Sequence, residues 1–531
     1  MKTELKIFKN TAAACISILL ASNLQAQDSY VWDALQFSQT TAPGSARMQG
    51  MAGAQTALGG EASASANNPA GLGQLRKSYY TFSPAFTLAN TKADYDNSGN
   101  LGGVKTRLTI PNFSLAFAYP KEDLNSDKWR GGTFVISYNR INDFNRNFNF
   151  ANDNIKGSMI TDDLIPNNNG TYDSKYYEEG TNGTISSLGS LAYNTFLINP
   201  IITKQNYNVD PSGYKQYSTL NNMQIDHTSQ SGYVNTKGNM SQWDFAGGVN
   251  YNDKVLLGAS LGIVTLNYSE DRFYSENIFA KNNTQTLTYF DYLQSRKASG
   301  TGVKATAGVQ FLPVKFIRLG ASITTPTFMN VNESFSALTM NSSVVSGTEV
   351  IVNYDNNGNP GYDNVPTQNS QTMPAGTNSY SLYLPGKASA GIALVSKLGI
   401  LSADIDYVDY ASTNFTNGGR NSKQALNNNK FITSNFNGAF NYRVGAEARL
   451  DENYRIRAGY GVYGNGVSSL QKSSDIQNIT VGGGYRDDDM MVDISYTLLQ
   501  SSLKDYQYSG SPAVDVKTKK STVMVTVGLF F

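Results

Sequence analysis

The reactive side chains of this sequence limit the chemistry that it can perform. It has one histidine, His227, and one cysteine, Cys15, in 531 residues. A histidine-based catalytic triad and a multi-histidine zinc site are therefore impossible. Haem ligation would have to rely on His227, tyrosine or methionine. We expect no enzymatic activity, no metal and no other cofactor.

Three segments match the sequence motifs of known binding loops in part. Residues 459–464 (GYGVYG) match a dinucleotide-binding motif, but the sequence after them predicts a loop where that motif requires a helix. We interpret these glycines as facing a lumen or relieving strand curvature. Residues 94–99 and 353–358 begin like calcium loops, yet Lys105 and Asn364 stand where the loop needs glutamate. Turn formation explains both segments, with loose calcium binding as the alternative.

Charged residues alternate with apolar ones in two consecutive segments near the C-terminus. The charged set is Arg443, Glu447, Arg449, Arg455 and Arg457. Period-two alternation predicts strands, and in a barrel this set would line the lumen. We interpret it as a network that braces the wall or holds a plug. Binding of a carboxylate headgroup is the alternative.

The N-terminus predicts export. A basic start, an apolar run over residues 11–21 and the small residue Ala26 form a secretory signal peptide, 1–26, cleaved near Ala26. The apolar run follows Cys15 rather than preceding it, which disfavours lipidation. The mature chain then lacks cysteine, so disulfides are excluded. It carries 39 basic and 40 acidic residues, a balance that gives no reason to expect nucleic-acid binding.

Composition and patterning indicate an all-β membrane protein. The chain has 48 glycines and 33 tyrosines, with 16% charged residues, which favours strands and turns over helices. No later stretch has the roughly 18 consecutive apolar residues of a membrane-spanning helix. If the exported chain enters a membrane, it must do so as a closed barrel, because lipid cannot satisfy unpaired backbone groups.

Alternating segments predict fourteen strands. They lie at 79–89, 105–119, 131–141, 241–251, 254–268, 301–312, 315–325, 386–395, 399–410, 439–450, 453–463, 476–486, 488–500 and 519–531. Long and short connections alternate between them, as in outer-membrane barrels, and the largest predicted loops are 142–240 and 326–385. We expect a transmembrane antiparallel β-barrel over 79–531. Both termini and the short turns are expected on the periplasmic side.

Residues 27–78 precede the first strand and do not alternate; they predict short helices that hang below the barrel or plug its lumen. Residues 44–72 (GSARMQGMAGAQTALGGEASASANNPAGL) resemble the N-terminal hatch of the FadL/TodX family of outer-membrane transporters for hydrophobic molecules. The residues that carry the resemblance are Asn68, Pro69 and Ala70, with Gly44, Arg47, Gly50 and Gly53 ahead of them. Gly60-Glu61 replaces the family's usual acidic pair. Residues 187–200 and 300–326 resemble long Bacteroidetes-type members.

The resemblance implies passive uptake of long-chain fatty acids or similar hydrophobic molecules across the outer membrane of a Gram-negative bacterium. The ligand would enter by an apolar groove among outer loops, pass to the lumen and leave sideways after the hatch shifts. A non-transporting scaffold for secretion or surface attachment is the alternative. Expected partners are the ligand, outer-membrane lipid and lipopolysaccharide, and the barrel assembly machinery, through the last strand that ends at Phe531.

One apolar stretch inside the polar loop 142–240 is the candidate groove. Its residues are Ile185, Leu188, Leu191, Phe196 and Leu197. An apolar patch kept in an outer loop marks a contact site. The equally weighted alternative is that it packs the loop onto the barrel rim.

Overall fold

The structure is a computed structural model of the 531-residue chain. It describes residues 28–531 except 122–127, 165–184, 186, 201–216, 220–224, 281–285, 345–348, 355–359, 365, 417–421, 468–472 and 509. The predicted signal peptide lies outside the described residues.

Fourteen strands form a closed antiparallel ring. In ring order they are β1 (Tyr79–Tyr95), β2 (Asn100–Pro120), β3 (Trp129–Asp143), β7 (Ile225–Tyr251), β8 (Val255–Ala280), β9 (Thr286–Val314), β10 (Ile317–Thr324), β17 (Lys387–Val395), β18 (Gly399–Asp409), β20 (Gly438–Arg449), β21 (Tyr454–Tyr463), β22 (Ile476–Arg486), β23 (Met490–Tyr506) and β24 (Ala513–Phe530). β24 pairs with β1 and closes the ring. The predicted fourteen-stranded barrel is confirmed.

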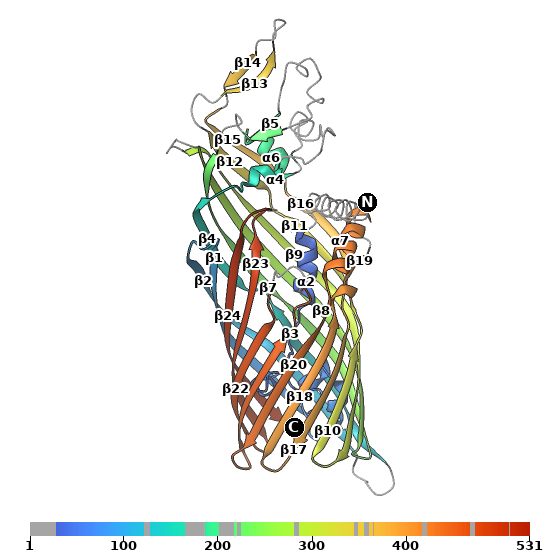
Figure 1. The fold of residues 1–531 in the computed structure, drawn as a ribbon. Coiled ribbons are helices and arrows are strands. Elements are labelled where there is room, and N and C mark those ends of the chain that lie inside the picture. The colour runs from blue at the N-terminus through green and yellow to red at the C-terminus, as the bar shows by residue number, and fades with distance from the viewer. Residues whose placement is uncertain are drawn as a thin grey trace, which may run out of the picture.

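The wall rises well above the ring on one side (Figure 1). The strands added to the wall are β4 (Arg146–Ile155), β11 (Thr327–Phe335), β12 (Leu338–Val344), β15 (Gln368–Met373), β16 (Gly376–Leu384) and β19 (Asn414–Thr416). Two separate two-stranded sheets are formed by β5 (Ile198–Pro200) with β6 (Tyr217–Thr219) and by β13 (Glu349–Tyr354) with β14 (Pro360–Asn364). Residues 146–155 and 225–240 of the predicted loop 142–240, and most of 326–385, are therefore strand, which corrects that prediction. On β11, β12 and β16 the inward positions are apolar, as at Met329, Met340 and Leu382, and most outward positions are polar. Hydropathy therefore alternates there with the opposite sense to the lower wall.

The exterior of the lower wall is apolar. Leu257, Leu261, Val309 and Phe311 on β8 and β9 point outward and are 39 to 53% exposed. Inward positions on the same strands are buried and polar, such as Gln310. This inside-out pattern is that of a barrel in lipid. In the part of the chain that the structure describes, no helix is both long and apolar enough to cross a membrane.

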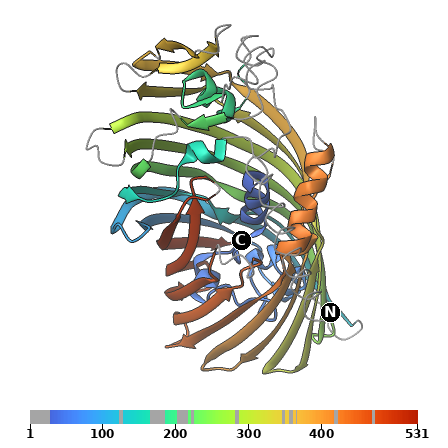
Figure 2. The same ribbon diagram turned by 45° about the horizontal axis from the view of Figure 1, so that its top comes forward.

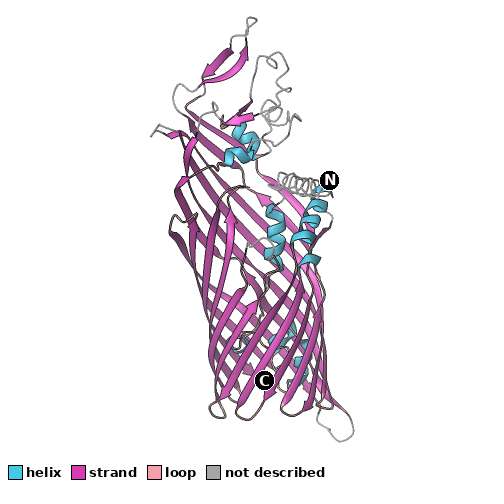
Figure 3. Ribbon diagram, viewed as in Figure 1, coloured by secondary structure: helices cyan, strands magenta, loops and turns pink. Residues whose placement is uncertain are grey.

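The N-terminal segment fills the interior of the ring (Figure 2; Figure 3). Its helices are α2 (Asp28–Ser38), α3 (Ala46–Gly50) and the 3-10 turns η1 (Ala62–Ala66) and η2 (Pro69–Gln74). The other helices are α4 (Ile160–Leu164), α6 (Leu188–Asn194), η5 (Tyr410–Ser412) and α7 (Ser422–Asn435).

The two ends of the described chain lie at different heights. Phe530 pairs with Tyr79 at the short-turn end, as predicted for the C-terminus. The helix α2 lies much higher, beside β9 and α7 (Figure 1). The expectation that both termini lie at the short-turn end is therefore wrong for the start of the described chain. The reason is that Val31 and Phe37 of α2 are buried in the barrel interior.

Candidate functional site inside the barrel

The hatch, residues 42–75, lies against wall positions that have no side chain. Gly248, Gly258 and Gly308 lie in register on β7, β8 and β9. A Cβ on Gly258 would lie 2.3 Å from the carbonyl carbon of Pro69, and one on Gly308 would lie 1.9 Å from Asn68 Oδ1. Glycine therefore lets the hatch backbone approach the wall directly.

The candidate hatch motif occupies this glycine niche. Asn68 Nδ2 donates to Thr56 O at 2.7 Å and to Val309 O at 3.2 Å, so it joins η2 to another part of the hatch and to β9. Its Oδ1 accepts from Ala70 N at 3.2 Å and caps η2, with Pro69 at the first position. Asn68, Pro69 and Ala70 are all buried.

The other hatch-motif residues shape the turn around α3. Gly44 and Gly53 have positive φ, 144° and 76°, and a Cβ on Gly53 would lie 2.4 Å from Ala42 Cβ. Gly50 lies near β22: a Cβ on Gly50 would lie 3.5 Å from the Cα of Gly482. Arg47 projects from α3 to the wall.

A network of buried charges joins the hatch to β18, β20, β21 and β23. The contacts are Arg47 to Glu447 at 3.1 Å and to Glu61 at 3.6 Å, Arg457 to Glu447 at 2.7 Å and to Asp493 at 2.5 Å, and Arg443 to Asp406 at 2.5 Å and to Asp404 at 3.5 Å. Asp404 Oδ2 also accepts from Gln55 N, Thr56 N and Thr56 Oγ1 at 2.8 to 2.9 Å. Each of these cations is paired with wall or hatch carboxylates. These ion pairs hold the hatch against the wall, and we call them the charge lock.

Two members of the predicted charge cluster lie apart from this lock. Arg449 is exposed and Arg455 is half-buried, at the short-turn ends of β20 and β21. Arg455 donates to the backbone oxygens of Asn453 and Glu452. The structure therefore pairs Glu447 with Arg457 and places Arg443 in a separate ion pair with Asp404 and Asp406.

Two apolar clusters lie above the hatch. The middle cluster contains Val31, Leu35 and Phe37 of α2, packed with Phe144 and Tyr268 of the wall. Ring centroids of Phe37 and Phe144 are 5.6 Å apart. The upper cluster contains Phe148, Phe150, Tyr274, Phe290 and Tyr292, with residues of α6.

The candidate groove residues belong to the upper cluster. Ile185, Leu191 and Leu197 are buried and Leu188 packs against them. Phe196 is half-buried and has a φ of 60°. In this structure the patch faces the barrel interior, so any ligand that reaches it must displace or enter a packed cluster.

A polar belt separates the two clusters. Arg296 pairs with Asp33 of α2 and with Glu270, and Arg272 pairs with Asp505 at 2.8 Å. Along β8 the side chains run from Tyr268 in the middle cluster through Glu270 and Arg272 to the upper cluster. Burial raises the pKa of the Asp33 carboxyl, while the Arg296 guanidinium opposes that shift. In this conformation the apolar path along the lumen is interrupted.

The upper barrel wall has a break, with β2 on one side and the end of β3 and then β4 on the other; we call it the break between β2 and β4. Among the described residues, the β2 to β3 ladder runs from Pro120↔Gly131 to Asn112↔Asn139 and ends there. Pro111, the next residue of β2, has no N–H to continue it. Above this point β4 pairs with β7 alone, and a Cβ on Gly103 of β2 would lie 2.1 Å from Asn147 Oδ1. The inward face of β2 therefore lies directly against β4.

Side chains bridge this break. Asn149 Nδ2 donates to Gly102 O at 3.4 Å, and Ser98 Oγ donates to Ala151 O at 2.6 Å. Lower down, Arg140 of β3 donates to Thr109 Oγ1 of β2 at 2.9 Å. Phe144, between β3 and β4, belongs to the middle cluster, so the break adjoins apolar interior.

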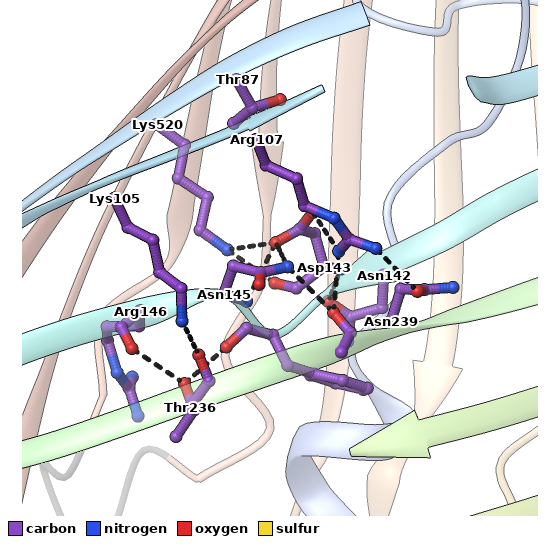
Figure 4. A network of polar contacts seen from close by, with 12 residues as sticks. Thr87, Lys105, Arg107, Asn142, Asp143, Asn145, Arg146, Thr236, Asn239 and Lys520 are labelled. Carbon is purple, nitrogen blue, oxygen red and sulfur yellow. Dashed lines mark hydrogen bonds and ion pairs between the residues drawn. The ribbon is translucent and has the colours of Figure 1, made fainter. Parts of the chain in front are cut away.

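A basic group lines the same break (Figure 4). Arg140, Lys520 and Arg107 lie 3.2, 3.4 and 3.7 Å from the carboxylate of Asp143. Lys105 Nζ instead donates to neutral oxygens, Asn235 Oδ1 at 2.8 Å and Thr236 O at 2.7 Å. Three cations thus contact one carboxylate and a fourth, Lys105, pairs with neutral oxygens beside them, which leaves the group with excess positive charge.

Sequence reasoning missed this basic group and the glycine niche. The cations come from β2, β3 and β24, and no single segment shows them together. Pro111 in the middle of a predicted strand was the available signal for a break. Glycines on inward positions of neighbouring strands were the signal for the niche.

Comparisons with known proteins find similar structures but no similar sequence. No protein-family model and no curated protein matches the sequence. The structure is similar to that of a FadL homologue of Pseudomonas aeruginosa, at 12% identity over 92% of this chain and 98% of that chain, with a TM-score of 0.49. It is also similar to the toluene transporters TodX of P. putida (10% identity, 92% and 99% covered, TM-score 0.47) and TbuX of Ralstonia pickettii (13%, 92% and 99%, 0.45). At such identities and scores, these matches give no evidence of a shared activity.

Proposed function

We propose that this protein is a passive outer-membrane transporter of hydrophobic molecules that carry an acidic headgroup, long-chain fatty acids above all. One observation carries the proposal: the wall break between β2 and β4 adjoins the apolar middle cluster through Phe144 and is lined by excess positive charge. An apolar chain suits the cluster, and a carboxylate suits the cations.

The proposed route enters at the end of the barrel with the long strands. The ligand passes the upper cluster, then the polar belt, and reaches the middle cluster after α2 moves. The hatch lies below and opposes a straight exit into water. Sideways exit through the break instead keeps an apolar chain out of water, which is favourable because exposing apolar surface costs free energy. In this proposal the hatch motif holds the plug in place, and the groove residues form the surface at which the ligand enters.

Uptake of a labelled long-chain fatty acid tests this route and the role of the headgroup. Replacing Lys105 and Arg107 with Gln removes two cations that face the break. We expect the double variant to lose roughly tenfold in uptake of the acid, the factor that about 1.4 kcal/mol of binding represents. Uptake of the alcohol of equal chain length should change little. Lys519→Gln, an outward and exposed position on β24, is the matched control.

Two outcomes would contradict the proposal. Equal loss for acid and alcohol would remove the headgroup role. No uptake by the correctly folded wild-type barrel, together with a stably bound protein partner, would favour the scaffold function instead. Mass spectrometry of lipophilic molecules that co-purify with the barrel identifies the ligand class independently.

A further inference from the structure

A cavity of about 590 Å³ opens on the outer surface of the wall, away from the lumen. It is formed by β8, β9 and β11, at the level where the wall extends beyond the ring (Figure 1). Its lining includes Asn267, Ser299, Thr301, Asn330 and Asn332, whose side chains point outward and are exposed. None of its lining residues is ionisable.

The cavity begins at a sharp boundary on the outer surface. Its lower edge is a row of apolar residues in register, in which Val303 of β9 pairs with Ile263 of β8 and Phe328 of β11. Phe328 pairs in turn with Tyr383 of β16, and their ring centroids are 5.1 Å apart. Aromatic rings of this kind mark the membrane interface of outer-membrane barrels.

The rows directly above are polar. Thr301 pairs with Thr265 and Asn330, and Ser299 pairs with Asn267 and Asn332. The small side chains of Ser299 and Thr301 form the floor, and the longer asparagines form the sides. Ser381 and Ser379 of β16 donate to Oδ1 of Asn330 and Asn332 at 2.7 and 2.8 Å, which fixes the two amides beside the cavity.

We propose that this cavity binds the saccharide of a glycolipid in the outer leaflet, with the sugars of lipopolysaccharide as its occupant. Amides and hydroxyls both donate and accept hydrogen bonds, as sugar hydroxyls require. The neutral lining suits uncharged sugar rings rather than phosphate. The exposed Phe328 ring offers an apolar face to sugar C–H groups, while the acyl chains of the same lipid lie along the apolar wall below. This site is independent of uptake through the lumen.

The test compares binding of two purified glycolipids by the folded, full-length barrel in mild detergent. One is lipopolysaccharide with its core sugars, and the other is lipid A without them. Native mass spectrometry should show wild-type protein retaining the core-bearing lipid at least tenfold better. Thr301→Trp, which fills the floor from outside, should abolish that preference. Ser521→Trp, at an outward position on β24, should retain it.

A second variant tests the same site independently, in case Thr301→Trp does not fold. Asn330→Leu with Asn332→Leu removes the amides while keeping side-chain size, and it should lose the preference as well. Equal retention of both lipids by the wild type would overturn the proposal. So would an unchanged preference in the folded Thr301→Trp and double-leucine variants. Neither result would bear on fatty-acid uptake.

Discussion

At the scale of residues, the contact between hatch and wall depends on glycines, which have no side chain. Gly248, Gly258 and Gly308 make a niche into which the Asn68-Pro69-Ala70 backbone fits. The sequence predicted that this motif belongs to a plug through its resemblance to a known hatch, since position before the first strand alone left open a segment that hangs below the barrel. It could not show which wall glycines receive it, because strand register decides that and long connections separate the strands.

Gly258→Ala tests the niche. The new Cβ would meet Pro69 and Ala70 backbone atoms at 2.3 and 2.4 Å, so η2 must move away from the wall. We expect a loss of about 1 to 3 kcal/mol in stability, as for overpacked cores, and increased leakage of a small dye through the barrel. Thermal unfolding and liposome leakage measure the two effects. Gly247→Ala is the matched control, because a Cβ there meets nothing closer than 4.0 Å; equal effects of both changes would refute the niche.

Asn68→Ala tests the motif itself. It removes the η2 cap and the bonds to Thr56 O and Val309 O. Thr56 O keeps Gln310 Nε2 as a donor at 3.0 Å, so we expect a cost of about 0.5 to 2 kcal/mol, mainly from the lost cap, with higher permeability and normal barrel assembly. Heat-modifiable electrophoretic mobility reports assembly. Asn90→Ala, on the exposed face of β1, should behave as wild type, and unchanged permeability of Asn68→Ala would count against the seating role.

At the scale of elements, strands were predictable where each has one apolar and one polar face. The lower part of β9 shows this contrast, with Val309 and Phe311 outward and Gln310 inward. Its upper part carries Ser299 and Thr301 outward, so hydropathy no longer alternates although the backbone does. The position of α2 was not predictable either, because its apolar face fits any buried site and only the completed barrel offers one.

The anchoring of α2 gives a prediction at this scale. Asp33→Asn breaks the buried ion pair with Arg296, a change that costs about 3 to 5 kcal/mol in typical buried pairs. We expect faster hydrogen exchange in α2, with little change in β1 and β24, because α2 contributes no strand to the ring. Hydrogen-exchange mass spectrometry compares it with Asp488→Asn, whose carboxylate is exposed. Uniform loss of protection across the barrel would show that α2 is not a separately movable element.

At the scale of the whole molecule, the barrel is closed below by the hatch and interrupted above it at the side. The charge lock of Arg47, Glu447 and Arg457 holds the hatch to the wall. Among the described residues, no strand ladder joins β2 to β4 across the break; the bonds from Asn149 and Ser98 cover it. The middle cluster and the basic group meet at that break, which makes sideways release through it the central claim.

Stapling β2 to β4 tests that claim most directly. The mature chain predicted from the sequence has no cysteine, so Ser98→Cys with Ala151→Cys introduces one pair across the break, where the Ser98 hydroxyl donates to the backbone oxygen of Ala151 at 2.6 Å. Thr339→Cys with Thr372→Cys staples an intact ladder whose hydroxyls are 2.8 Å apart and serves as the control. Fatty-acid uptake is measured under oxidising conditions and again after reduction. We predict that the 98–151 disulfide stops uptake and that reduction restores it, while the 339–372 disulfide has no effect; full uptake with the 98–151 disulfide formed would contradict exit through the wall.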